Sequence, residues 1–234
     1  MIVPNFIPGP EEVAANVSME PYGLRVAFIR RVMLLHFGSA GIVAVLMQLP
    51  FPAVGTRLAG FALALVLVVL AVQRILQRGG RSEASVASAC LVVLLPAVAW
   101  FVHEIRYTGI PIWAPAVGLG AMLLYTLLCG RDFSFVGCFS LALVVSSVAI
   151  ALLCRTHQLT GWTSGRALTL NAAALLFWTY DLGYLMARRR RGEELAAVTD
   201  LYRDVLNVFG YIPRVILHWR RHRIWSRPDG WHAK

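Results

Sequence analysis

The chain has 234 residues, of which 58% are hydrophobic and 15% are charged, and its mean hydropathy is +0.66. A soluble domain of this length does not need so much apolar surface, so the composition indicates an integral membrane protein. Basic residues outnumber acidic ones by 22 to 12, which gives a formal net charge of +10. In a chain this apolar, the arginine excess indicates contact with lipid headgroups and argues against nucleic acid as a partner.

Residues 1–30 form a predicted polar N-terminal segment. Its first 20 residues contain acids and three prolines where a secretory signal would have a basic start and an apolar core. The segment also lacks the arginine-rich, acid-poor character of a transit peptide. A location inside an organelle would therefore require internal targeting signals or a presequence that has been removed.

Six apolar stretches follow, each near the roughly 20 residues that a helix needs to span the hydrocarbon core. They cover approximately residues 31–49, 57–73, 85–102, 112–129, 133–154 and 167–187. The loops between them are short, so the predicted fold is all-α, a polytopic transmembrane helix bundle with six spanning helices. The four cysteines, Cys90, Cys129, Cys138 and Cys154, lack metal-ligand spacing and are predicted to be small buried residues.

The arginines are distributed unevenly between the two ends of the predicted bundle. Most lie in the loops on the side of the N-terminus, which also holds the run Arg188 to Arg191. The positive-inside rule places this side in the cytoplasm, or in the matrix of a mitochondrion. We therefore predict an integral membrane protein and favour the mitochondrial inner membrane, with other intracellular membranes as the alternative.

The last apolar stretch, residues 199–219, differs from the other six because it is interrupted by polar and helix-breaking residues. These are Asp200, Arg203, Asp204, Asn207, Gly210, Pro213 and Arg214. Polar backbone at membrane depth is tolerated only inside protein or beside a water-filled cavity. We predict a half-spanning or core-buried segment here, or a seventh helix, which completes a bundle domain over residues 31–219.

Residues 220–234 form a basic, tryptophan-containing tail. Arginine and tryptophan are enriched at the anchor positions of protein interfaces, and both also contact lipid headgroups. The predicted partner or lipid contacts are Arg220, Arg221, Arg223, Trp225, Arg227 and Trp231.

Two acids are the leading candidates for function, Asp181 within the sixth apolar stretch and Asp204 in the last one. A carboxylate at the centre of a membrane helix costs about 2.5–3.5 kcal/mol and usually marks a functional pathway. One hypothesis is a latch in which the two carboxyl groups share a proton between helices. The alternative is that Asp181 bonds a hydroxyl while Asp204 pairs with Arg203 or Arg214. Asp200 lies four residues before Asp204 and can form a surface ion pair with Arg203.

No cofactor, metal site or enzymatic activity is predicted. His36 lies beside Gly38, Ser39 and Gly41, a patch of small residues that predicts close contact with another helix. The other histidines lie near helix ends or in the tail, so none is placed to be a second haem ligand. Ser39 lacks a motif that would supply a catalytic base, and a nucleophile elbow is also missing.

Three segments resemble the Bax inhibitor family of polytopic membrane proteins. "LRVAFIRRVMLLHFGSAGIVAVL" resembles the family's basic lead into its first helix. "YTLLCGRDFSFVGCFSLALVVSSVAIALL" is similar to its Lys/Arg-Asp-hydrophobic-Ser turn and the following helix, with Arg131, Asp132, Ser134 and Gly137 in the matching places. "LFWTYDLGYLMARRRRGEE" and "DLYRDVLNVFGYIPRVI" resemble the last helix pair with its two membrane acids.

Two functions follow as hypotheses. The resemblance implies a pH-sensitive calcium or cation leak in which Asp181 and Asp204 form the gate, although the second stretch lacks the acid that the family carries there. The sequence itself favours a divergent, non-catalytic accessory subunit of a larger membrane complex, such as a respiratory assembly. The helices offer few polar residues to line a pore, and the tail has the residue types of a binding anchor. The predicted partners are membrane lipids and other subunits.

Overall fold

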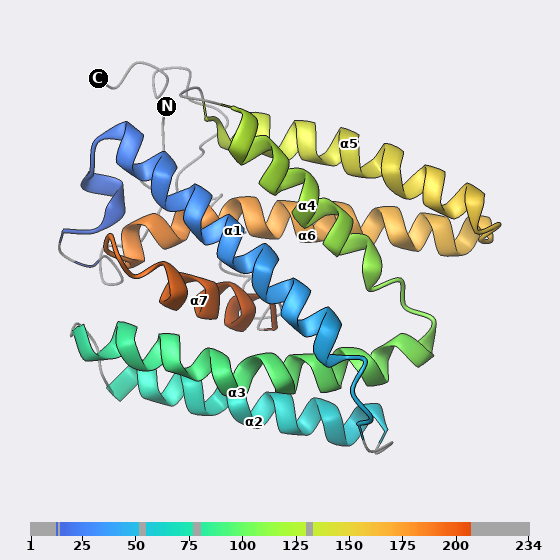
Figure 1. Cartoon of the computed structure of the whole chain (residues 1–234), viewed down its shortest axis with the longest axis horizontal. Coiled ribbons are helices and arrows are strands. Elements are labelled where there is room, and N and C mark those ends of the chain that lie inside the picture. Colours follow the sequence, from blue (N-terminus) through green and yellow to red (C-terminus); the bar gives the residue numbers. More distant parts are fainter. Residues whose placement is uncertain (1–12, 14, 52–54, 77–80, 130–132, 207–234) are drawn as a thin grey trace, which may run out of the picture.

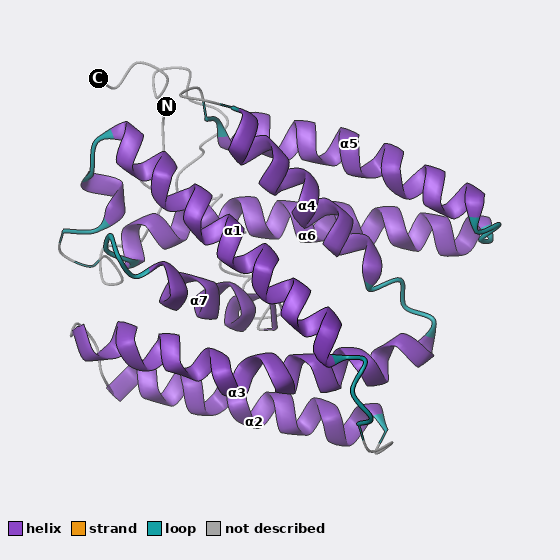
Figure 2. Cartoon of the chain, in the orientation of Figure 1, coloured by secondary structure: helices purple, strands orange, loops and turns teal. Residues whose placement is uncertain are grey.

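A computed structural model describes residues 13, 15–51, 55–76, 81–129 and 133–206 of the chain. All regular structure in these residues is helical (Figure 2). The α-helices are α1 (Tyr22–Leu46), α2 (Thr56–Leu76), α3 (Arg81–Ile105), α4 (Trp113–Leu128), α5 (Phe135–Thr156), α6 (Gly161–Arg188) and α7 (Glu194–Leu206). Two single turns of 3-10 helix, η2 (Val17–Met19) and η3 (Arg106–Thr108), precede α1 and follow α3. The predicted all-α class is confirmed, with a helix in each of the six apolar stretches.

Three helices are long and apolar enough to cross a membrane, over Tyr22–Leu46, Ala84–Thr108 and Phe135–Thr156. Only 22–33% of the most apolar part of each is buried inside the protein. Their outward faces carry large apolar side chains such as Val92, Val144 and Leu152. Helices that are apolar on their outer as well as their inner faces suit a lipid environment, because lipid replaces protein as the neighbour of the outer side chains. The expected six spans remain a prediction for the other helices.

The helices form two groups that are joined by α1 and α7 (Figure 1). On one side α4, α5 and α6 pack against one another, and on the other side α2 and α3 form a hairpin. α1 packs against α3, α4 and α7, while α7 contacts α1, α2, α3 and α6. The described part of the final segment therefore lies inside the bundle as far as Asp204, in agreement with the core-buried alternative.

The main apolar core connects these helices around α7. It includes Ile29 and Met33 of α1, Leu94 of α3, Leu185 of α6 and Leu201 of α7, all essentially inaccessible. Inside a membrane such side chains stabilise the bundle mainly through close van der Waals packing between helices. This packing fixes the position of the polar face of α7 against the end of α6.

The segment before α1 covers the C-terminal end of α6. Backbone N–H groups of Val13 and Val17 donate to the carbonyls of Ala187 and Arg189, at 3.1 and 2.9 Å. The Val17 side chain is buried, and the side chain of Asn16 caps η2 by accepting from the N–H of Ser18. These bonds satisfy carbonyl groups that a helix end leaves without an intrahelical partner.

α1 begins at Tyr22, well before the predicted start at residue 31, so part of the predicted polar segment is helical. Its polar side chains make contacts across the bundle. The hydroxyl of Tyr22 donates to the carbonyl of Phe133 at 2.8 Å, and Nε of Arg30 donates to the carbonyl of Thr126 at 2.7 Å. Tertiary hydrogen bonds therefore extend the helix through residues that hydropathy alone assigns to a polar segment.

Candidate functional site

A tight reversal of the chain places α7 beside the end of α6. α6 ends at Arg188, and Glu193 closes the turn by accepting from the N–H of Arg190 at 3.0 Å through its side chain. Gly192 has a φ of +90°, a conformation that side chains disfavour. Glu194 in the first turn of α7 complements the positive end of the helix dipole.

One face of α7 carries three charged residues at helical spacing. Asp200, Arg203 and Asp204 occupy positions i, i+3 and i+4, which are neighbours on a helix surface. Nη1 of Arg203 lies 2.8 Å from Oδ1 of Asp200. The Nε and Nη2 atoms of Arg203 each lie 3.0 Å from Oδ1 of Asp204. A single guanidinium therefore bridges both carboxylates of α7.

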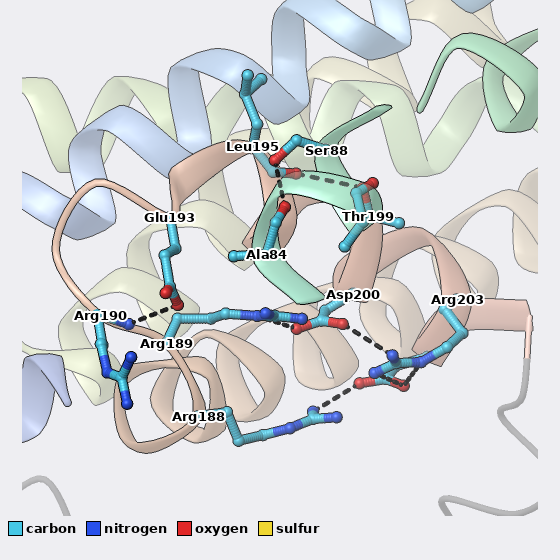
Figure 3. A network of polar contacts seen from close by, with 12 residues as sticks. Ala84, Ser88, Arg188, Arg189, Arg190, Glu193, Leu195, Thr199, Asp200 and Arg203 are labelled. Atoms are coloured by element: carbon cyan, nitrogen blue, oxygen red, sulfur yellow. Dashed lines mark hydrogen bonds and ion pairs between the residues drawn. The ribbon is translucent and has the colours of Figure 1, made fainter. Parts of the chain in front are cut away.

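The end of α6 supplies two further arginines to the same carboxylates (Figure 3). Nε of Arg189 donates to Oδ2 of Asp200 at 2.6 Å, and Nη1 of Arg188 donates to Oδ2 of Asp204 at 2.8 Å. The Arg188 guanidinium also lies over the ring of Tyr184, 4.2 Å from its centroid. We call this alternating chain of charges the ladder; its members are Arg189, Asp200, Arg203, Asp204 and Arg188, in order of contact.

The ladder is almost completely removed from solvent. The side chains of Asp200 and Arg189 are 1% and 4% exposed, and that of Arg203, the most accessible member, is 12% exposed. Buried charges lose hydration energy that their mutual attraction only partly restores, so such pairs add little net stability compared with apolar residues. Removing one partner is nevertheless strongly destabilising, because it leaves a charge buried alone. The ladder thus fixes the relative position of α6 and α7.

Several predicted site residues are brought together here. Asp204 pairs with Arg203, as one alternative predicted, and both of its oxygens contact arginines. The proton shared with Asp181 stays a prediction. The pair between Asp200 and Arg203 forms as expected, but inside the protein and not on the surface. Arg214 lies outside the described residues, as do the tail residues Arg220, Arg221, Arg223, Trp225, Arg227 and Trp231.

Asp181 is completely buried within α6. It lies seven residues before Arg188, which places both residues on the same face of α6, about 10.5 Å apart along the axis. Asp181 and Arg188 therefore lie at different depths on one buried face of α6, with the core residue Leu185 between them.

Sequence reasoning did not identify Arg188 and Arg189 as site residues, because both were grouped with the loop arginines that set topology. A signal was present in the spacing. A pair of arginines ends one helix and a pair of aspartates follows within the next helix, so a reversal between them brings the opposite charges together.

α7 is also tied to α3 through Thr199, whose hydroxyl donates to the carbonyl of Ala87 at 2.8 Å.

A second polar cluster lies where α1, α6 and α7 meet. It consists of His36 and Ser39 of α1, Trp178 of α6 and Tyr202 of α7, and we call it the histidine cluster. The Ser39 and Tyr202 hydroxyls are 2.9 Å apart. The predicted contact through small residues differs from the observed one, because Gly38 and Gly41 face open space, with nothing within 4 Å of an added Cβ.

Replacing Tyr202 with phenylalanine removes the hydroxyl that links α7 to Ser39 and keeps the aromatic ring. We expect the free energy of unfolding to fall by about 0.5–1.5 kcal/mol, the usual net value of one hydrogen bond. Denaturant titration of the purified protein in detergent measures this change. An unchanged midpoint would show that this hydrogen bond does not contribute to holding α7 in place.

Within the described residues, no three or more His, Cys, Asp or Glu side chains are grouped in a way that would hold a metal ion. No family model, curated protein or solved structure matches the chain at a significant level.

Proposed function

We propose that this protein is an ion-handling membrane bundle, a cation leak, in which the ladder is the gate in its closed arrangement. The observation that carries the proposal is the burial of Asp181 and of the five charged ladder side chains within the helix bundle. Charged residues inside membrane segments are costly, and they usually mark ion or proton pathways. The resemblance of the sequence to the Bax inhibitor family supports the same function.

The proposed gate works through the pairing of charge. In the closed arrangement guanidinium groups cover the carboxylates of Asp200 and Asp204, and α7 is held against α6. Protonation of one carboxylate weakens its ion pairs with Arg203 and with the arginine of α6 that it contacts, so α7 is held less firmly against α6. Movement of α7 then uncovers acidic side chains that attract a cation. Acidification is therefore expected to increase flux.

We expect Asp204→Asn to raise the basal cation flux of liposomes that contain the purified protein. The amide keeps the size of the side chain but removes the counter-charge of Arg188, so the open arrangement becomes more populated. A shift of about 1.4 kcal/mol in this equilibrium changes the open fraction roughly tenfold. Calcium-sensitive dye trapped in the liposomes measures the flux, at neutral and acidic pH.

Arg31→Gln is the matched control for this experiment. Arg31 also forms an ion pair, with Glu194 at 3.4 Å, but its side chain is 60% exposed and it is not part of the ladder. This variant should leave flux unchanged. Equal flux in wild type and Asp204→Asn, with both proteins folded, would contradict the gate.

A second candidate function is the non-catalytic accessory subunit, with a respiratory complex of the mitochondrial inner membrane as one setting. The observation that favours it is that arginines contact both oxygens of Asp200 and of Asp204, which suits a static brace as well as a gate. Extraction in gentle detergent, native gel separation and mass spectrometry distinguish the two. Stoichiometric co-migration with a large complex, lost on truncation after Trp219, supports the subunit. Migration alone supports the leak.

A further inference from the structure

The histidine cluster contains buried polar atoms that the ladder does not use. His36 is 3% exposed and Trp178 is 8% exposed. The His36 ring meets the rings of Tyr202 and Trp178 edge-on, with centroids 4.9 and 5.7 Å apart. The cluster therefore joins α1, α6 and α7 through closely packed side chains.

The hydrogens of both hydroxyl groups in the cluster are already used in hydrogen bonds. Oγ of Ser39 donates to the carbonyl of His36 at 2.7 Å, which uses its only hydrogen. In the 2.9 Å contact between Ser39 and Tyr202, the tyrosine hydroxyl must therefore be the donor. Neither hydroxyl has a hydrogen left to offer to the imidazole ring.

Three ring nitrogens of the histidine cluster have no hydrogen-bond partner among the described residues. Neither Nδ1 nor Nε2 of His36 has a hydrogen-bond partner among the described residues, and the same holds for Nε1 of Trp178. A neutral imidazole has one donor and one acceptor, and an indole has one donor. Leaving such a group unsatisfied inside a protein costs about 1–3 kcal/mol, and native structures rarely tolerate it.

We propose that the histidine cluster is an internal hydration site, where a water molecule bonds to His36 and Trp178. Water matches these groups because it both donates and accepts, and buried waters typically make two to four hydrogen bonds to otherwise unsatisfied polar atoms. A metal ion lacks support here, because the described residues include no group of three His, Cys, Asp or Glu side chains that could hold one. The hydration site follows from the packing and the unpaired ring nitrogens of His36 and Trp178, and it does not depend on the proposed cation leak.

A role of this water in cation conduction, in contrast, rests on the proposed function as a leak. Trp178 precedes Asp181 by one helical turn on α6, and Tyr202 is adjacent to Arg203 of the ladder. Water at the histidine cluster would therefore lie near Asp181 and the ladder, where it would supply an oxygen ligand to a cation that has left the ladder.

Hydroxyl-radical footprinting with X-ray pulses tests the hydration site in the full-length protein in lipid nanodiscs. Radicals form from water in place, so buried side chains next to a bound water are modified. We expect modification of His36 and Trp178, with Met122 and Met186 unmodified. Both methionines are completely buried, and methionine is at least as reactive toward this radical as histidine. Protection of His36 and Trp178 equal to that of Met122 would overturn the proposal.

Two variants separate the site from general loosening of the bundle. His36→Leu removes both nitrogens, so modification of Trp178 should fall to the level of Met122. His36→Gln keeps a donor and an acceptor, so modification of Trp178 should persist, and this variant decides the question if His36→Leu does not fold. Persistent modification in His36→Leu would contradict the site. A hydrated cluster in a protein without cation flux would refute the leak and leave the hydration site intact.

Discussion

Asp204→Ala is expected to lower the free energy of unfolding by about 3–5 kcal/mol, the range found when one partner of a buried ion pair is removed. The carboxylate of Asp204 contacts Arg188 and Arg203, whose side chains are 5% and 12% exposed. Without it, the Arg188 guanidinium loses its charged partner in the ladder inside a poorly hydrated environment. Arg203 still contacts Asp200, so the loss falls mainly on Arg188.

Thermal and denaturant unfolding of the purified protein in one detergent measure this effect. Arg31→Gln is the control, because it removes the ion pair with Glu194 through a side chain that is 60% exposed. Exposed pairs contribute about 0–1 kcal/mol, so this variant should unfold almost as wild type does. If both variants lost a similarly small amount of unfolding free energy, the ion pairs of Asp204 would behave as exposed pairs, which would contradict the buried ladder.

The double variant Arg188→Met with Asp204→Leu distinguishes lost charge balance from lost packing. Apolar side chains of similar size often replace a buried ion pair without loss of stability. The double variant should therefore be more stable than Asp204→Ala alone, even though two site residues are changed. A loss equal to the sum of the two single changes would mean that Arg188 and Asp204 act independently.

The position of each of the first six helices could be predicted from hydropathy, because apolar side chains that face lipid and core give long uninterrupted stretches. The fifth stretch, predicted at 133–154, agrees closely with Phe135–Thr156. The early start of α1 could not be predicted in this way. Tyr22 and Arg30 have polar groups that reach partners on other parts of the bundle, and hydropathy does not register such partners.

The start of α7 was also missed, since the predicted segment began at residue 199 and the helix begins at Glu194. Its first turns contain small and charged residues whose burial depends on neighbouring helices. Ala196 and Ala197, for example, are completely buried although they add little hydropathy. The acids of α7 could be identified from the sequence. Their partners Arg188 and Arg189 could not, because the chain reversal at Gly192 brings them together and a count of charges in each loop does not reveal that reversal.

A close approach of α4 to α6 requires a glycine at position 118. A Cβ added to Gly118 would overlap Oδ1 of Asn171 and come within 3.2 Å of Leu175. Asn171 cannot move aside freely, because it is completely buried and its Nδ2 donates to Oγ of Ser146 at 2.8 Å. Ser146 in turn is bonded to the carbonyl of Ala142 at 2.6 Å. The three helices α4, α5 and α6 are therefore packed with little room at this point.

Gly118→Ala is therefore expected to reduce the free energy of unfolding by about 1–3 kcal/mol, as overpacked core substitutions do. Gly120→Ala on the same helix is the control, since its Cβ would meet Phe37 at an ordinary 3.5 Å. Alanine is the better helix former by about 0.8–1.0 kcal/mol, so the control should be neutral or slightly stabilised. Unfolding of both variants side by side measures the difference. Adding Asn171→Ala to Gly118→Ala removes the overlapping oxygen and should recover part of the loss, whereas no recovery would place the strain at Leu175.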